Sequence, residues 1–481
     1  MWPRSTLLIV LAVLGLVPGC AEVSPAPLSA EASAGELEGR TLDDPRLRTF
    51  LRASLMRDDR PGGDAGWNLT ALTIAAIYYH PELDLARARL ALARAGVITA
   101  GQSANPVLNL SAELDTAGVP GAIPAGALPL TIGPVINLVV ESFGKREYRT
   151  AQAQHLAEAA EWALSSAGWR LRGQVRTALL DLWAARRRMA LSGQRLDLQE
   201  ELVRLLEKRL AAGAANSLEV SRERIARARI ALARGEFEQS ADKAEAQLAA
   251  AIGVPLRAVA DKKLGFDAFE HPRPAATAAV LGELRRRALT GRADVQAALA
   301  DYEAAQAGLQ LAVANQYPNL ALGPGYVYDS GLNRFSLSPA IELPIFHQNQ
   351  GQIAEALAKR QQAAASFTTV QSKIIAAIDS ALAAWRAARR ELATAAALLA
   401  SAQRRGAQTA AAFSSGQVDR PDLVTAELET ADVRLARVDA VMRQLQALGA
   451  LEDALEQPLF EAEGGFTVPP VGPRPGSEPL P

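Results

Sequence analysis

Apolar and polar residues alternate in two stretches of the chain, 106–141 and 318–346, and the alternation predicts a β-hairpin in each. In the second stretch every other residue is apolar or proline over 320–328, and the pattern resumes over 335–345 after a short turn. Strands of about ten residues with one apolar face have the length and pattern of a transmembrane β-hairpin. Taken alone, the pattern favours a hairpin of an ordinary soluble sheet, because the signal of a single barrel strand is weak.

The rest of the pattern is helical, with apolar residues recurring every three to four positions. We expect helices over 68–103, 145–212, 218–252, 350–413 and 422–456. At 1.5 Å per residue the second of these is on the order of 100 Å long, far beyond an ordinary globular helix. Helices of this length have to bury their Leu and Ala stripes against neighbouring helices.

The order of these elements occurs twice in the chain. An alignment of the two halves places Pro106 on Pro318, both at the start of a hairpin, and Gly213 on Gly416, both in a turn between long helices. This duplication predicts two tandem repeats with one fold. The expected organisation is a signal peptide (1–19), a lipidated N-terminal tether (20–66), a first repeat (67–254), a connector (255–275), a second repeat (276–457) and a disordered C-terminal tail (458–481).

The N-terminal segment has the features of an export signal. Arg4 precedes an apolar run over 7–17 that is too short to span a bilayer, and Cys20 follows that run. A cysteine at this place resembles a bacterial lipobox, in which the thiol is acylated and the cysteine becomes the mature N-terminus. In such lipoproteins Ala21 would permit passage to the outer membrane. The alternative is a plain signal peptide with an incidental thiol.

Composition and charge argue against several functions. The chain has 51 Lys and Arg against 52 Asp and Glu, so no electrostatic argument favours nucleic acid as a partner. It has no phosphate-binding glycine loop, and its four histidines have no metal-ligand spacing with one another or with Cys20. We therefore expect no enzymatic activity, no metal and no cofactor.

The predicted hairpins need more than one chain to form a stable structure. Two hairpins give too few strands to close a barrel, because a barrel of fewer than about eight strands has no room for its side chains. An open sheet with an apolar outer face would leave both of its edges and a large apolar patch exposed. We therefore expect several chains to form a ring, in which the two kinds of repeat alternate around one axis.

Several motifs of the chain resemble the TolC family of outer membrane efflux proteins. They are the strand starts NPVLNL and YPNLAL, the passage ELPIFHQNQGQIAEALAKRQQA from Glu342, and its shorter cognate VVESFGKREYRTAQAQ from Val139. The segment HPELDLARARLALARAGVITAG from His80 is most similar to the branch that serves heavy-metal resistance-nodulation-division (RND) pumps. The resemblance covers about residues 68–457.

This resemblance implies a mostly helical fold with membrane β-hairpins and a homotrimeric assembly. A twelve-stranded outer membrane β-barrel would be continued by a long periplasmic α-helical barrel, with outer membrane lipid around the strands. The implied function is that of a passive exit duct, to which a periplasmic adaptor (membrane fusion protein) and an inner membrane RND-type pump deliver the substrate. The protein would be lipid-anchored in the bacterial outer membrane and extend into the periplasm.

The resemblance also implies two kinds of site. The turns between the long helices would dock the adaptor, at Arg209, Leu210, Gly213 and Ser217 in the first repeat and at Phe413, Gly416, Gln417 and Val418 in the second. A periplasmic gate would be formed by Asp422, three copies of which would make a negative constriction, with Asp419 adding to the ring. Thr425 stands where the archetype has its second gate acid. Asp422 is equally well explained as an acid that complements the dipole of a helix N-terminus.

Two other functions fit parts of the pattern. A periplasmic coiled-coil adaptor or scaffold lipoprotein also has long helical hairpins, but it should have only one of them, flanked by a split lipoyl-like motif. A type I secretion duct would share the whole architecture. Metal ions, drugs and polypeptides all stay open as the transported substrate.

Overall fold

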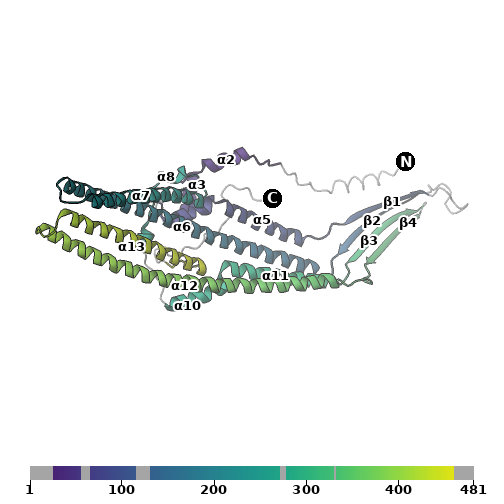
Figure 1. Ribbon diagram of the computed structural model, residues 1–481. Coiled ribbons are helices and arrows are strands. Elements are labelled where there is room, and N and C mark those ends of the chain that lie inside the picture. Colours follow the sequence, from purple (N-terminus) through teal and green to yellow (C-terminus); the bar gives the residue numbers. More distant parts are fainter. Residues whose placement is uncertain (1–24, 56–65, 115–129, 271–277, 330–331, 460–481) are drawn as a thin grey trace.

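A computed structural model describes residues 25–55, 66–114, 130–270, 278–329 and 332–459 (Figure 1). The molecule is elongated, with a β-sheet at one end and two pairs of long helices that extend to the other end (Figure 1). Shorter helices lie around the middle of the long ones. The fold is mostly helical with two β-hairpins in tandem repeats, as the sequence predicts.

The four strands form one antiparallel sheet in the order β1-β2-β3-β4, so that β2 and β3 join the hairpins of the two repeats. The register pairs apolar with apolar positions, for example Leu110 with Pro134 and Leu322 with Pro339. The alternating apolar residues of all the strands therefore share one face, as predicted. The strands are β1 (Val107–Leu114), β2 (Leu130–Val140), β3 (Leu320–Asp329) and β4 (Leu332–Ile341).

The last strand is shorter than predicted. We expected alternation to continue to Ile345, but β4 ends at Ile341. Beyond it the Ile345 amide donates to the Leu343 carbonyl at 2.8 Å, which closes a tight turn around Pro344. Ile341 lies opposite Leu320, the first residue of β3, so the pairing stops where the partner strand begins.

The long helices form two antiparallel pairs, α6 (Lys145–Ala211) with α7 (Ser217–Ile252), and α12 (Gln350–Ser414) with α13 (Arg420–Leu455). With 67 residues, α6 is about 100 Å long at 1.5 Å per residue. It also packs against α13 of the other pair. The four helices therefore follow one another in space as α7, α6, α13 and α12. On the side of the sheet, α5 (Pro81–Gly101) and α11 (Ala293–Ala314) pack against α6, and α11 also packs against α12.

The continuous helix expected over 68–103 is wrong, because two helices occupy this range. α4 (Leu69–Tyr79) ends at His80, whose ψ of 124° is extended, and α5 begins at Pro81. The proline ring disfavours a helical backbone at the residue before it, which breaks the helix at this point. His80 then caps α5, since its Nδ1 accepts from the Glu82 amide at 3.3 Å.

The middle of the molecule holds the largest apolar core. It includes Leu42, Leu47 and Leu51 at 0% exposure, from the segment expected as a tether, packed with residues of α4, α6 and α7. Arg40 connects the C-terminal ends of α4 and α7. Its Nη1 donates to the carbonyls of Tyr79 (2.6 Å) and Gly253 (2.9 Å). The surrounding short helices are α2 (Ala30–Gly39), α3 (Pro45–Leu55), α8 (Arg257–Ala260), α9 (Asp267–Glu270) and α10 (Ala278–Gly291).

A buried ionic cluster joins α6 to the end of α13 near this core. The Glu452 carboxylate, fully buried, accepts from Arg176 at 2.8 Å, from Arg172 at 3.3 Å and from the Leu459 amide at 2.8 Å. Arg176 also donates to Asp453 at 2.6 Å. Because these groups are removed from water, each needs its partners to offset the cost of desolvation.

Candidate functional site

The two turns between the long helices, which we call the tips, have one geometry. Each contains a glycine with a left-handed backbone, Gly213 at φ 71° and Gly416 at φ 76°. The amide after Gly213 donates back to the Arg209 carbonyl at 2.8 Å, and the second tip repeats this bond. A side chain disfavours this backbone conformation, so glycine at both positions has a local physical reason.

Polar side chains cap the helix that leaves each tip. Asn216 accepts from the Glu219 amide at 2.8 Å, and Asp419 accepts from the Asp422 amide at 3.1 Å. Ser217, a predicted docking residue, is the first residue of α7 and is exposed. Caps of this kind satisfy amides that have no partner within the helix.

The structure brings the two tips together. Arg209 of the first forms an ion pair with Asp419 of the second, and Arg420 of the second pairs with Glu201 of the first at 2.7 Å. Behind these pairs lies an apolar cluster, which we call the tip cluster, formed by Leu202, Leu206, Val220, Val424 and Leu428. Two residues predicted for separate sites, the adaptor contact Arg209 and the gate acid Asp419, are thus direct partners.

The predicted gate acids form a reciprocal cap at the start of α13. The Asp422 carboxylate accepts from the Asp419 amide at 3.3 Å, while the Asp419 carboxylate accepts from the Asp422 amide. Asp422 is exposed and Asp419 half-buried. Asp422 thus lies in the first turn of a helix, where an acid complements the helix dipole as the alternative explanation has it, and it also makes a capping hydrogen bond that this explanation did not include.

The other predicted tip residues lie on the outer surface of the turns. Leu210 and Phe413 are apolar side chains that are 36% and 39% exposed at the very end of the molecule. Gln417 is exposed beside them and Val418 is half-buried. An exposed leucine and an exposed phenylalanine at matching ends of the two repeats are suited to contact with another protein.

The ion pair of Arg420 with Glu201 was not predicted. In the sequence, Arg420 is one of many arginines and Glu201 is one of many helical carboxylates. The two residues lie 219 positions apart, so no local pattern connects them. The Arg420 guanidinium holds the pKa of the Glu201 carboxyl below its ordinary value.

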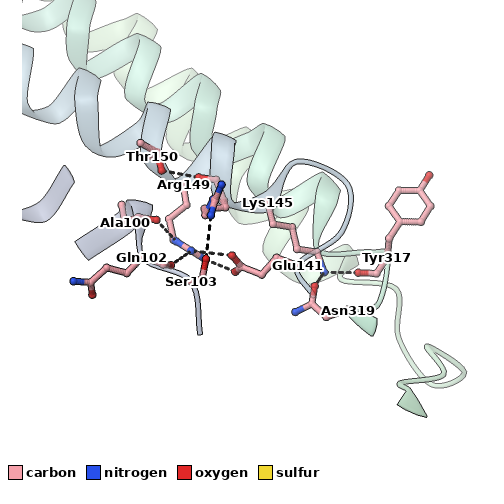
Figure 2. A network of polar contacts seen from close by, with 10 residues as sticks. Ala100, Gln102, Ser103, Glu141, Lys145, Arg149, Thr150, Tyr317 and Asn319 are labelled. Atoms are coloured by element: carbon pink, nitrogen blue, oxygen red, sulfur yellow. Dashed lines mark hydrogen bonds and ion pairs between the residues drawn. The ribbon is translucent and has the colours of Figure 1, made fainter. Parts of the chain in front are cut away.

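A polar network links the sheet to the helices at the opposite end from the tips (Figure 2). Arg149 of α6 donates to both carboxylate oxygens of Glu141, at 2.7 and 3.1 Å, and to the carbonyls of Ala100 (2.8 Å) and Gln102 (3.1 Å). These hydrogen bonds from Arg149 hold the pKa of Glu141 below its ordinary value. A single side chain therefore fixes the end of β2 and the linker from α5 to β1.

Lys145 does the same for the linker from α11 to β3 (Figure 2). Its Nζ donates to the Tyr317 carbonyl at 2.5 Å and to the Asn319 side chain at 2.6 Å. The Tyr317 ring stacks on Phe143 with 4.1 Å between centroids. The N-terminal end of α6 thus holds the base of the hairpins from both repeats, a role that the sequence pattern did not indicate.

Other predictions concern single residues and general features. Cys20, the predicted lipidation site, lies outside the described residues. Within the described ranges, no three His, Cys, Asp or Glu side chains gather as a metal site would require. In the same ranges no helix has both the length and the apolar character needed to cross a membrane.

Comparison with known proteins gives two relatives that have the same sequence identity to this chain. Pyoverdine export outer membrane protein OpmQ of Pseudomonas aeruginosa is 27% identical over 301 residues, which is 59% of this chain and 62% of OpmQ. Cobalt-zinc-cadmium resistance protein CzcC of Cupriavidus metallidurans is 27% identical over 230 residues, 47% of this chain and 53% of CzcC. The chain therefore spans less than two thirds of the length of either relative.

The fold is also that of a solved outer membrane protein. The crystal structure of VceC from Vibrio cholerae matches with a TM-score of 0.64 and 23% identity, over 81% of this chain and 96% of VceC. In sequence, the family described as outer membrane efflux protein matches residues 75–254 and 284–456, one segment in each repeat. The chain belongs to the outer membrane efflux protein family, in agreement with the resemblance seen in its motifs.

Proposed function

We propose that the protein is the outer membrane channel of a tripartite efflux system, and that it acts as a passive exit duct. The observation that carries this proposal is the sheet, whose four strands share one apolar face at the end of a layer of long helices. Leu110, Phe335 and Leu337 on this face are 72%, 85% and 67% exposed in the single chain. Such a surface is suited to contact with lipid. Placing these side chains in the membrane would remove their apolar surface from water, which is favourable.

The assembly that we propose is a homotrimer. The β1 and β4 edges are unpaired within the described chain, and pairing β4 with β1 of the next copy would close twelve strands into a barrel. The face opposite to the apolar one consists mainly of small or uncharged residues such as Ser111, Gly133, Gly323 and Ser338. Lining of this kind leaves space for a passage and supports a duct rather than a binding site.

The partners and the location follow from this role. We propose that the tips meet a periplasmic adaptor, that an RND-type inner membrane pump supplies the substrate, and that Cys20 carries a lipid anchor in the outer membrane. Exposed Leu210 and Phe413 support the first of these, because they place apolar surface at the end of each tip. OpmQ is named for pyoverdine export and CzcC for cobalt, zinc and cadmium resistance, and we propose an export function of the same general kind here.

Reconstitution tests the duct. The purified full chain in planar lipid bilayers should form channels, and native mass spectrometry in detergent should find three chains. Labelled palmitate should enter the wild type and not Cys20→Ser. The duct would be refuted if Cys20→Ser were recovered as a soluble periplasmic monomer, the behaviour expected of a scaffold lipoprotein that only its anchor holds at the membrane.

The proposed gate needs a variant that separates charge from helix capping. Asp422→Asn removes the charge but keeps a side-chain oxygen that can accept from the Asp419 amide, as the carboxylate does at 3.3 Å. If Asp422 lines a constriction, this variant should raise conductance and weaken cation preference, with an unchanged melting temperature. Unaltered conductance and selectivity would leave Asp422 with its capping role alone.

A further inference from the structure

In each repeat, the helix that returns from a tip ends where the helix that leads to the sheet begins, and we call each meeting point a joint (Figure 1). At the first joint the end of α7 meets the start of α5, and at the second the end of α13 meets the start of α11. The alignment that matches the tip glycines also matches the last residues before the two joints, Gly253 and Glu456. Both have a left-handed backbone, at φ 84° and 49°. The two joints are therefore counterparts.

The second joint is held by residues of the two helices that meet there. Arg292, just before α11, donates through Nη1 to the carbonyls of Asp453 (3.0 Å) and Ala454 at the end of α13. In return the Glu456 carboxylate accepts from the Ala293 amide at 2.9 Å, at the start of α11. Each helix end thus satisfies backbone groups of the other that have no partner within their own helix. Glu456 does so from a backbone conformation that a side chain disfavours, which these contacts offset.

The first joint lacks both of these side chains. Gly253 stands in place of Glu456, and a Cβ there would lie 3.0 Å from the His80 Cα. His80 stands in place of Arg292, since each is the residue that precedes the helix leading to the sheet. The His80 Nδ1 accepts from the Glu82 amide at 3.3 Å and so caps its own helix, α5. The carbonyls at the end of α7 therefore need a donor from another part of the chain.

That donor is Arg40, which lies in the N-terminal segment before α4 and outside both repeats. Its Nη1 donates to the carbonyls of Gly253 (2.9 Å) and Tyr79 (2.6 Å), and its guanidinium lies over the Tyr79 ring, 5.5 Å from the centroid. Three leucines with no exposed surface fix the segment to the core independently of Arg40: Leu42, Leu47 and Leu51. Arg40 is therefore held in place at the first joint, as Arg292 is at the second.

We propose that Arg40 is a positioning residue of the channel wall, which holds the first joint as Arg292 and Glu456 hold the second. The first tip then depends on the N-terminal segment, whereas the second tip depends on its own repeat alone. The connection to the tip is α7, one continuous helix that runs from the first tip to the first joint and contributes Val220 to the tip cluster. The effect on channel opening rests on the proposed function, and the joint itself does not.

Hydrogen exchange, measured by mass spectrometry on the full chain in detergent, tests the joint. Arg40→Ala should speed exchange of the Gly253 and Val254 amides about tenfold, because a charged hydrogen bond to the end of α7 is lost. Exchange of the Gln457 amide, at the second joint, should not change. Arg292→Ala is the matched control and should give the opposite pattern. Arg40→Ala keeps the three buried leucines, so the segment should stay folded.

Rescue separates this role from a general loss of stability. His80→Arg places a guanidinium where the second repeat has Arg292, and combined with Arg40→Ala it should restore slow exchange at Gly253. His80→Ala in the same background should not. Equal loosening of both joints in Arg40→Ala, or no recovery with His80→Arg, would overturn the assignment, because Arg40 would then be an ordinary part of the core.

Single-channel recording in planar bilayers tests the connection to the tip. Arg40→Ala should raise the ratio of open to closed channels severalfold, because α7 then places Val220 less firmly in the tip cluster. Addition of His80→Arg should return the ratio to the wild-type value. Wild-type opening in Arg40→Ala would overturn the dependence of the tip on the N-terminal segment. Absence of channels in the wild type would overturn the proposed function and the effect on opening, and the exchange result would still decide the joint.

Discussion

The tips are held together by ion pairs and by apolar packing, and the structure predicts which of these controls their separation. In the proposed duct, a wider opening at this end requires α13 to move away from α6. That movement would break the pair of Arg420 with Glu201 and would also expose Leu428 of the tip cluster. We compare Arg420→Ala, which removes the ion pair, with Leu428→Ala, which removes the packing.

The expected magnitudes differ. The side chains of Arg420 and Glu201 are 37% and 30% exposed, and a solvent-screened pair of this kind contributes at most about 1 kcal/mol. Leu428 is 9% exposed, and truncation of a buried leucine costs about 2 kcal/mol or more. With about 1.4 kcal/mol per factor of ten, Leu428→Ala should raise the ratio of open to closed channels about 30-fold, and Arg420→Ala at most about fivefold.

Single-channel recording in planar bilayers measures this ratio directly. Ala231→Asp, at an exposed position of α7, serves as a control for surface substitution, since Ala231 belongs neither to the ion pairs nor to the tip cluster. A double-mutant cycle with Glu201→Ala isolates the energy of the ion pair itself. The reasoning is refuted if Arg420→Ala opens the channel more than Leu428→Ala does, because the ion pairs would then hold the tips closed.

Three further predictions concern stability, measured as unfolding in detergent. Glu452→Ala leaves the buried guanidinium groups of Arg172 and Arg176 with one counter-charge fewer, and should lower the free energy of unfolding by about 3–5 kcal/mol; a loss below about 1 kcal/mol would contradict this. Gly449→Ala would place a Cβ 2.6 Å from Arg176 Nε and should cost about 1–3 kcal/mol, while Gly193→Ala, with nothing within 4 Å, should be neutral or stabilising. Burial raises the pKa of Glu456, so its protonated form is favoured in the folded state, and stability should fall as pH rises from about 4.5 through the raised value. Glu456→Gln should flatten this dependence of the melting temperature on pH, and parallel curves for variant and wild type would exclude it.

Much of the fold could be predicted because its signals are local. Strict alternation gave both hairpins and their apolar face, and glycine gave both tips at Gly213 and Gly416. The break at His80 was also present in the sequence, in the proline that follows it, but the strong helical periodicity on both sides concealed it. The periodicity extends over many residues, whereas the break depends on a single residue that disfavours a helical backbone at its neighbour.

The contacts of the candidate sites were harder to predict, since they depend on register between distant helices. Nothing near Glu201 in the sequence indicates Arg420, and the pairing requires α6 and α13 to be aligned to within one turn. Lys145 and Arg149 stand near the start of a long helix, and nothing in the sequence distinguishes them from the many other basic residues of the chain. Their importance comes only from the linkers that fold back to meet them at the base of the sheet (Figure 2).

The two contacts between the tips also differ in what a partner has to supply. Arg209, Asp419 and Arg420 are only half-buried, so a charged surface brought to the tips can compete for their ion pairs. Because a solvent-screened pair contributes at most about 1 kcal/mol, this competition alone shifts the tips only slightly towards the open state. Separation also exposes the tip cluster, so charge on a partner is not enough to open the channel. A partner that opens it needs apolar surface as well, which covers Leu428 as α13 moves away from α6.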